Sequence, residues 1–115
     1  MAALTTQNIV NAGTKPTFGA AALTDTAEIG NGFNTFVVYK NTDTNAKTVT
    51  ITAPGNNDYG QPNPDPALAL AANTGELWIP LRKAYDPVDG TGRATLTVSG
   101  TGGVTGVTVA VVRAG

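Results

Sequence analysis

Strict alternation of apolar and polar side chains in short segments constrains the fold of this chain more than any other feature. The alternation is clearest in 48–52 (TVTIT) and 94–99 (ATLTVS). A period of two places all apolar side chains on one face, which indicates a β-strand with that face in a core. The segments 33–40, 76–82 and 104–113 are rich in aromatic and β-branched residues and are bounded by turn residues, so they are predicted as strands too.

Weaker strand signals bring the expected number of strands to about eight. The ALAL segment 67–70 is expected to pair with 76–82 across a turn at 72–75. Segments 7–10 and 17–22 are further candidates, although 19–23 could instead form one helical turn because it is rich in alanine. Pro80 cannot donate a ladder hydrogen bond, so its strand is expected at a sheet edge or with a bulge.

Composition agrees with a β-protein. Charged residues make up 13% of the 115 residues, so the polar surface must consist mostly of Thr, Asn, Ser and Gly, which suit strands and turns. The chain length predicts one domain. We expect an all-β fold, an antiparallel β-sandwich of jelly-roll or immunoglobulin-like type, with 1–16 as a partly extended N-terminal arm and 17–115 as the sandwich.

The connections alternate in length along the chain. Those at 42–46, 72–75 and 100–103 are short, and those at 23–32, 54–66 and 83–92 are long. If successive strands run in opposite directions, all long loops emerge at one pole of the sandwich. That pole is predicted to be acidic and to carry the residues Asp25, Glu28, Asp58, Asp65, Asp86, Asp89, Tyr59 and Tyr85.

The chain has no His and no Cys, which removes Ser-His and Cys-His nucleophiles and ordinary zinc sites. Two carboxylate pairs, Asp25 with Glu28 and Asp86 with Asp89, have the composition of a glycosidase site, but solvated turn acids explain them better. Calcium ligands could come from 86–90, or from 56–58 with Asn63 and Asp65, with Asx turns as the alternative. We expect no enzyme, cofactor or metal.

Charge and hydropathy bear on partners and location. The net charge is −1 with no basic run, so direct nucleic-acid binding is not expected. No apolar stretch approaches the length of a membrane span, and the first residues lack a secretory pattern, so the chain is expected to be a leaderless cytosolic product without a membrane partner.

Several residues are candidates for an interface. Trp78 is out of phase with Leu77, Ile79 and Leu81, so it faces outward if those three face the core; burial on both faces of the strand is the alternative. The complete candidate set combines the apolar residues of the arm with aromatic and basic residues elsewhere: Leu4, Ile9, Val10, Tyr59, Trp78, Arg82 and Tyr85.

Most of the chain resembles the small β-sandwich head proteins of tailed bacteriophages, especially those of actinobacterial hosts. The resemblance is carried by the segments NAGT (11–14), PTF (16–18), GNG (30–32), NTFVVYKN (34–41), GELWIPLR (75–82) and GVTVAVV (106–112). It implies a capsid decoration or cement protein on the virion surface, made in the host cytoplasm. The implied partners are the major capsid protein and other copies of this chain, as a trimer. A carbohydrate-binding module and a tail or baseplate accessory subunit remain alternatives.

Overall fold

The computed structural model describes residues 2–30, 32, 34–55, 58–85 and 92–114. These residues form ten strands and one short 3-10 helix, η1. The elements are β1 (Ala2–Ala3), β2 (Thr6–Ile9), β3 (Gly19–Ala20), β4 (Thr24–Glu28), β5 (Thr35–Asn41), β6 (Lys47–Ile51), β7 (Ala67–Leu70), β8 (Gly75–Pro80), η1 (Lys83–Tyr85), β9 (Arg93–Ser99) and β10 (Val107–Ala114).

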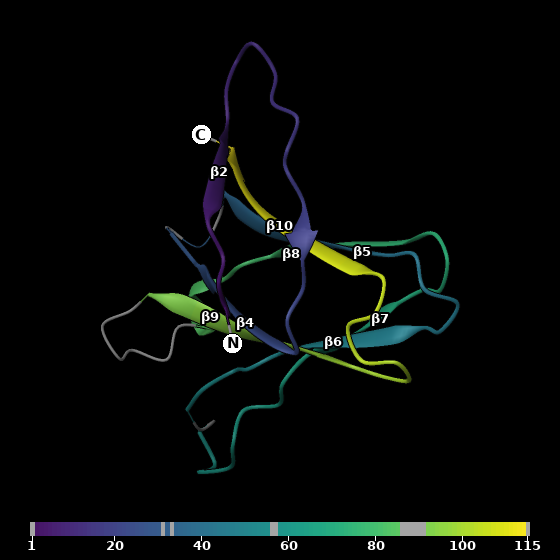
Figure 1. Cartoon of the computed structure of the whole chain (residues 1–115). Coiled ribbons are helices and arrows are strands. Elements are labelled where there is room, and N and C mark those ends of the chain that lie inside the picture. Colours follow the sequence, from purple (N-terminus) through teal and green to yellow (C-terminus); the bar gives the residue numbers. More distant parts are fainter. Residues whose placement is uncertain (1, 31, 33, 56–57, 86–91, 115) are drawn as a thin grey trace.

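Two sheets pack face to face (Figure 1). Sheet A has the order β1-β4-β9-β6-β7, and sheet B has the order β2-β10-β5-β8, with β3 also paired to β10. The antiparallel pairs are nested along the chain: β3 with β10, β4 with β9, β5 with β8 and β6 with β7. This nesting is that of a jelly roll, so the all-β sandwich prediction is confirmed and the jelly roll is the better of its two variants.

The strands predicted at 33–40, 48–52, 67–70, 76–82, 94–99 and 104–113 are confirmed as β5, β6, β7, β8, β9 and β10. Pro80 also lies where it was expected, because β8 is an edge strand of sheet B. The backbone N–H of Leu81 donates to Thr35 O, so the neighbouring residue Pro80 directs its nitrogen away from β5. The missing donor therefore leaves the ladder intact.

Two expectations were wrong, and the strand predicted at 17–22 is confirmed only for the two residues of β3, with no helical turn. The acidic stretch that becomes β4 was expected to be a loop. Segment 67–70 pairs with β6 rather than with 76–82, because the 71–74 connection crosses from sheet A to sheet B. Both errors concern partners far away in the sequence, since β4 is held by its register with β9.

The core lies between the two sheets and consists mainly of small aliphatic side chains. The strands from β4 to β10 direct every second side chain into the core, as the alternation predicted. The largest completely buried side chains are Tyr39, Ile51, Leu70, Ile79, Leu81 and Leu96, with Val37, Val49, Val98 and Val111 among the smaller ones.

The N-terminal residues 2–9, which we call the strap, run across the open side of the sandwich from sheet A to sheet B. β1 pairs parallel with β4, and β2 pairs parallel with β10. Between them, Leu4 packs against the core, and its N–H donates to Thr26 O at 2.8 Å. Figure 1 shows the strap in purple, rising from the N-terminus to β2. The strap thus covers an edge of each sheet, and the arm proposed for 1–16 contains it.

Two polar side chains, Asp25 and Tyr39, are completely buried in the core. Asp25 Oδ2 accepts a hydrogen bond from the N–H of Ala22 at 3.0 Å. Asp25 Oδ1 and Tyr39 Oη have no hydrogen-bond partner among the described residues. Burial, together with the charge of Asp25, raises the pKa of Tyr39 far above its ordinary value, so its hydroxyl stays protonated.

Replacing Tyr39 with phenylalanine is expected to leave the free energy of unfolding within about 0.5 kcal/mol of the original or to raise it by up to about 1 kcal/mol, because an unpaired buried hydroxyl costs desolvation energy. Urea denaturation of the two proteins measures the difference. A loss above about 1 kcal/mol would contradict this and show that the hydroxyl is hydrogen-bonded in solution.

Candidate functional site

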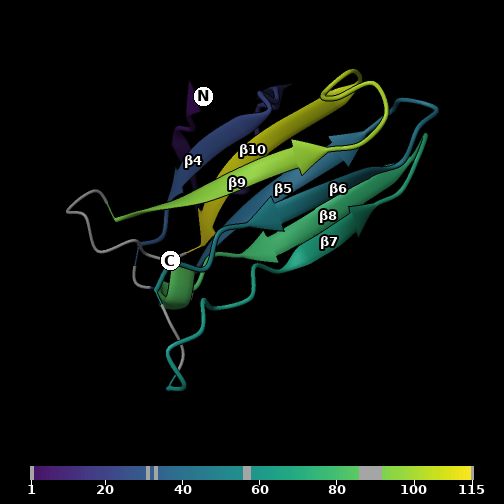
Figure 2. The same cartoon turned by 90° about the horizontal axis from the view of Figure 1, so that it is seen from below.

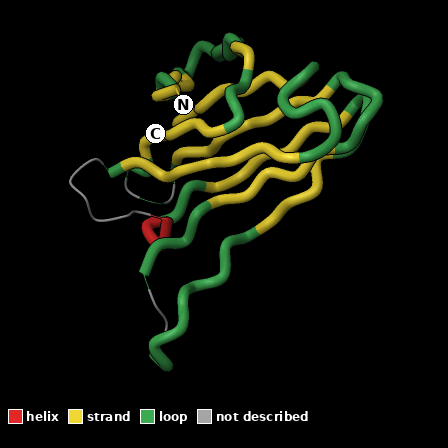
Figure 3. Tube along the Cα trace, turned by 60° about the horizontal axis from the view of Figure 1, so that its bottom comes forward, coloured by secondary structure: helices red, strands yellow, loops and turns green. Residues whose placement is uncertain are grey.

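The two poles of the sandwich differ, and two of the three connections expected to be long, 52–66 and 81–92, leave from the same pole. The third, expected at 23–32, is shortened to 29–34 because β4 occupies most of it. From β3 to β10 the chain changes sheet at every connection except the one between β6 and β7, and the paired strands are antiparallel. Connections 42–46, 71–74 and 100–106 therefore meet at one pole. Connections 29–34, 52–66 and 81–92 leave from the other pole. Figures 2 and 3 show the two ends, with η1 and the long 52–66 connection together at the second one.

The short-loop pole is held together by a buried polar cluster. The ammonium group of Lys47 is 2.8 Å from Asp43 Oδ2 and also donates to Thr101 O, and its side chain is fully buried. The hydrogen bond from Lys47 is the main reason that the pKa of Asp43 lies below its usual range. Asn41, also buried, donates to the carbonyl groups of Asn45 and Ala71. This pole is therefore a structural clamp.

The long-loop pole carries only part of the expected acidic set. Asp25 is not at this pole but in the core, and Glu28 pairs with two arginines. Asp65 accepts a hydrogen bond from Ala53 N at 2.8 Å and so fixes the base of the 52–66 connection, whereas Asp58 is exposed on it. Asp86 and Asp89 lie outside the described residues.

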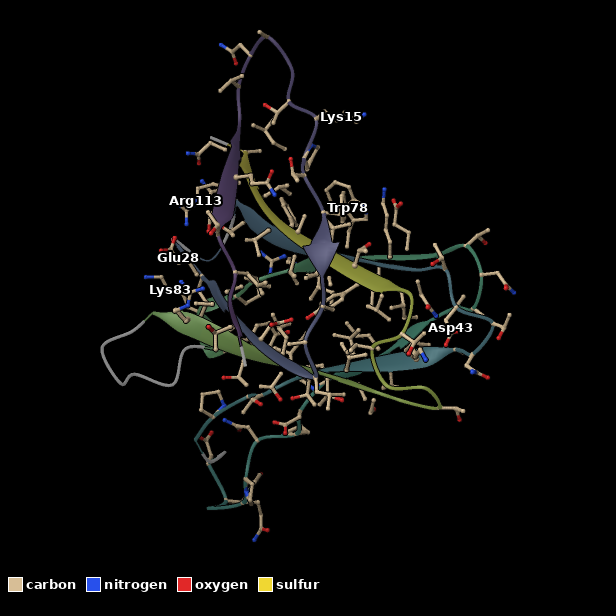
Figure 4. The ribbon with its side chains drawn as sticks, in the orientation of Figure 1. Lys15, Glu28, Asp43, Trp78, Lys83 and Arg113 are labelled. Atoms are coloured by element: carbon tan, nitrogen blue, oxygen red, sulfur yellow. The ribbon has the colours of Figure 1, made fainter. Side chains whose placement is uncertain are left out.

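Basic residues gather around the 29–34 connection instead. Arg82 Nη1 donates to Gly32 O, and the stem of Lys83 packs against Gly32. Arg113 lies against Gly30, and Arg93 joins it through Glu28. Figure 4 shows Glu28, Lys83 and Arg113 on one side of the molecule and Asp43 on the opposite side. We call Arg82, Lys83, Arg93 and Arg113 the basic cluster; they are four of the seven Lys and Arg residues.

No local pattern in the sequence indicates this cluster, because its members are scattered over the chain. A signal was nevertheless present: Arg82 and Lys83 follow β8, Arg93 begins β9, and Arg113 stands near the end of β10. In an antiparallel sandwich, the end of one strand and the start of the next lie at the same pole. The order and direction of the strands therefore place these four charged residues at one pole.

A hollow of about 400 Å³ lies beside the basic cluster, between the strap and the ends of β4, β9 and β10. Arg93 forms its best-fixed wall: Nε donates to Thr26 Oγ1, and Nη2 donates to Thr26 O and Leu4 O, all at 2.9–3.0 Å. Glu28 stands between the two arginines, 3.7 Å from Arg93 Nη1 and 3.6 Å from Arg113 Nη2. The remaining lining is mostly neutral and comes from the strap: Ala3, Leu4, Thr5, Thr6 and Asn8.

The outer faces of the two sheets differ sharply. The outward residues of β4, β6 and β9 in sheet A are mostly threonines: Thr24, Thr26, Thr48, Thr50, Thr95 and Thr97. The outward residues of β5, β8 and β10 in sheet B are mostly apolar: Phe36, Val38, Trp78, Pro80, Ala110 and Val112. Phe18, from the loop that follows the strap, extends this surface, and the centroid of its ring lies 4.3 Å from Lys40 Nζ. We call this outer surface of sheet B, together with Phe18, the apolar face.

Trp78 faces outward, as its phase predicted, and is 52% exposed. Its indole N–H donates to Glu76 Oε2 at 2.9 Å, and Glu76 in turn is 3.7 Å from Lys40 Nζ. On the adjacent strand the cross-strand neighbour Val38 is completely buried although it does not belong to the core cluster. The apolar face is thus a second layer of packing, of which Trp78 is the most exposed large side chain.

The other candidate interface residues do not form one patch. Ile9 and Val10 are exposed at the end of the strap, whereas Leu4 is half-buried on the core. Tyr59 is 88% exposed on the 52–66 connection, on another part of the molecule. Arg82 is exposed and belongs to the basic cluster. Tyr85 packs against the core, and its N–H donates to Arg82 O.

The proposed acid pair of Asp25 and Glu28 does not flank a common site, because Asp25 points into the core and Glu28 is 50% exposed on the other face of β4. Of the expected calcium ligands, Asn63 donates to Pro54 O, while 56–57 and 86–90 lie outside the described residues. The described residues contain no group of three or more acidic side chains suited to a metal ion. They also contain no helix that is long and apolar enough to cross a bilayer.

Comparison with known proteins gives no identification. No protein-family model matches the chain, and no match is found among curated proteins or among solved structures. A function is therefore inferred from the surfaces and residues of this chain itself.

Proposed function

We propose that this chain is a structural virion protein, a capsid decoration or cement protein that binds the outer surface of the major capsid protein shell and stabilises it. The observation that supports this most directly is the contrast between the outer faces of the two sheets. An antiparallel sheet with one face in the core normally exposes a polar face to water, as sheet A does. Most of the apolar face of sheet B, including Val38, Ala110 and Val112, is already buried within the chain, but Trp78 is 52% exposed on it and is suited to contact with another protein.

The chemistry of Trp78 fits such a contact. Tryptophan is among the residues that contribute most to the free energy of binding at protein interfaces, because its large ring buries much apolar area. The hydrogen bond to Glu76 holds the indole in place before binding, which reduces the conformational entropy lost on docking. Many copies on one shell would then add modest individual contacts to a large stabilisation of the particle.

Undecorated capsids, assembled from the major capsid protein of the genome that encodes this chain, provide the test. The purified chain is expected to co-sediment with them and to raise their melting temperature. Absence of both effects would refute the proposal. A location in the tail rather than on the head, seen by electron microscopy of complete particles, would favour the tail or baseplate alternative.

Replacing Trp78 with alanine is expected to weaken capsid binding by about 30-fold, the loss typical of an interface anchor worth about 2 kcal/mol. Thr50→Ala, which removes an outward side chain from sheet A, is the matched control and should bind as the original chain does. Equal binding by all three proteins would remove the apolar face from the contact. Specific signals on a glycan array that Trp78→Ala abolishes would instead support a carbohydrate-binding module.

A further inference from the structure

We propose that this chain forms a two-fold symmetric dimer through the edge strand β7, which pairs antiparallel with β7 of a second copy. The inference goes beyond the proposed function and does not depend on it, because the partner is the same chain. Three features support it: a sheet edge without protection, backbone groups without partners, and a register in which two identical edges satisfy each other.

The other sheet edges are protected against pairing. Each sheet ends in two edge strands, β1 and β7 in sheet A and β2 and β8 in sheet B. Proteins protect such edges with very short strands, charged residues, proline or a covering loop. β1 has only two residues, and β8 contains Glu76 and Pro80. At β2, the hydroxyl group of Thr14 from the following loop donates to Asn8 O and accepts a hydrogen bond from Val10 N.

The strand β7 has none of these forms of protection. Its four residues alternate between alanine and leucine and include no charge and no proline. Ala67 and Ala69 are exposed, and their methyl groups are too small to shield the backbone. Leu68 is half-buried against the core. Figure 2 shows β7 along the border of the sandwich. Nothing in its sequence therefore opposes the addition of another strand.

The backbone of β7 also has unused hydrogen-bonding groups. The N–H of Ile51 in β6 donates to Pro66 O at 3.0 Å, and in an antiparallel ladder only every second residue bonds to the same neighbour. Leu68 therefore directs its N–H and C=O toward β6, whereas Ala67 and Ala69 direct theirs away from the sheet. None of the described residues forms a hydrogen bond with the outward groups of these two alanines.

A two-fold axis through Leu68 matches these groups completely. It places Ala67 of each copy opposite Ala69 of the other, so that every outward N–H meets an outward C=O. The two Leu68 residues then face each other as a non-hydrogen-bonded pair, whose Cα atoms lie about 4.5 Å apart. Each leucine covers the part of the other that the single chain leaves exposed.

A second copy fits this edge because the edge is neutral. In a two-fold contact the same surface of each copy faces itself, so a charge close to the axis would meet its own like charge. β7 has no charge, and its outward alanines lie beside Thr48 and Thr50, so the threonine face of sheet A continues across the axis. The contact is small, so the dimer is expected to be weak in solution.

Sedimentation velocity of the isolated chain over a range of concentrations tests the association, which should appear as a monomer–dimer equilibrium. Ala69→Pro removes one outward N–H from each copy and leaves the ladder with β6 intact, so it should weaken dimerisation by about tenfold or more while Tm stays nearly unchanged. Ala69→Lys places charges near the axis and should have the same effect, which keeps the test open if the proline variant fails to fold.

Ala12→Lys is the matched control, because it adds the same charge to an exposed position in the loop after the strap. It should dimerise as the original chain does. A chain that stays monomeric up to its solubility limit would overturn the inference. A trimer, or a dimer that both Ala69 variants leave unchanged, would also overturn it.

Disulfide cross-linking tests the register. The chain has no cysteine, so a single introduced thiol reports on one contact. Leu68→Cys should give a covalent dimer on oxidation, because the Cα separation of a non-hydrogen-bonded pair lies within the range that a disulfide can span. Leu77→Cys, a half-buried position on the edge strand β8, should not. Cross-linking through position 77 alone would show pairing through β8 and overturn the inference.

Binding to undecorated capsids separates this inference from the proposed function. A dimer that does not bind capsids would support the inference and refute the proposed function. If the chain is monomeric by itself and Ala69→Pro abolishes capsid binding, then β7 receives a strand of the capsid protein. That result would overturn the inference and support the proposed function.

Discussion

Replacing Lys47 with methionine is expected to lower the free energy of unfolding by about 3 kcal/mol. Methionine keeps the length of the side chain but removes the ammonium group, which leaves the Asp43 carboxylate without its cation and Thr101 O without its donor. Removing one partner of a buried ion pair is strongly destabilising for this reason, although the 17% exposure of Asp43 lets water compensate in part. For a chain of this size, thermal unfolding should show a decrease in Tm of roughly 10 °C.

Lys40→Met provides the matched control. Lys40 is 44% exposed and 3.7 Å from Glu76, and it lies over the ring of Phe18. Such exposed ion pairs and cation–π contacts contribute little, so the loss should stay below about 1 kcal/mol. If the two methionine variants lose the same stability, the clamp at the short-loop pole does not stabilise the fold as described.

The same ion pair gives stability a dependence on acid. Folding lowers the pKa of Asp43, chiefly through the hydrogen bond from Lys47, so the ionised form is favoured in the folded state. The contribution is fully present above the ordinary pKa of an aspartate, about 3.9, and is lost as the pH falls through the lower folded value. Unfolding measured from pH 6 to pH 2 should therefore show an acid loss that is smaller in Lys47→Met.

Replacing Gly75 with alanine is expected to cost about 3 kcal/mol or more. A Cβ at this position would lie 2.0 Å from the backbone oxygen of Ala71 and 2.8 Å from its carbonyl carbon, and backbone atoms cannot move aside as a side chain can. The same oxygen accepts a hydrogen bond from buried Asn41, so any displacement also disturbs the clamp. Urea denaturation, or failure to obtain folded protein, measures the effect.

Gly19→Ala is the control for this prediction. Gly19 is also a strand residue, in β3, but a Cβ there meets no atom within 4 Å. Its replacement should leave stability unchanged or raise it by up to about 1 kcal/mol, because alanine restricts the unfolded chain. Equal losses for the two variants would mean that glycine is not sterically required at position 75, the first residue of β8.

Patterns with a short period were reliable guides to this fold. Thr48, Val49, Thr50 and Ile51 alternate in sequence and lie alternately outside and inside in β6, and Trp78 faces outward as its phase indicated. Lys47 shares the inward phase of Val49 and Ile51, so the same pattern already placed a charged side chain in the interior. Its partners on the 100–106 connection could not be found in this way, because no local pattern records them.

The candidate site was less predictable than the strands. The sequence supplied Trp78 and Arg82 as interface candidates, but it did not join Arg82 to Arg93 or Arg113, which are brought together only where β8, β9 and β10 end or begin at one pole. It also made Glu28 part of an acidic surface, whereas the structure places it between two guanidinium groups. Charges that are distant in sequence can be paired only after the order of strands is known.

The sequence by itself determined that this chain forms short antiparallel strands, that its long loops share one pole, and which side chains point away from the core. These properties depend on the two-residue period of a strand and on turn chemistry, which act between near neighbours. Only the tertiary structure decided that the polar segment Thr24–Glu28 is a strand, that residues 2–9 cover two sheet edges, and that four cations surround the 29–34 connection. The physical reason is that backbone hydrogen bonds in a sheet join residues from distant parts of the chain, so the partner of a strand depends on the order of strands in the whole sheet.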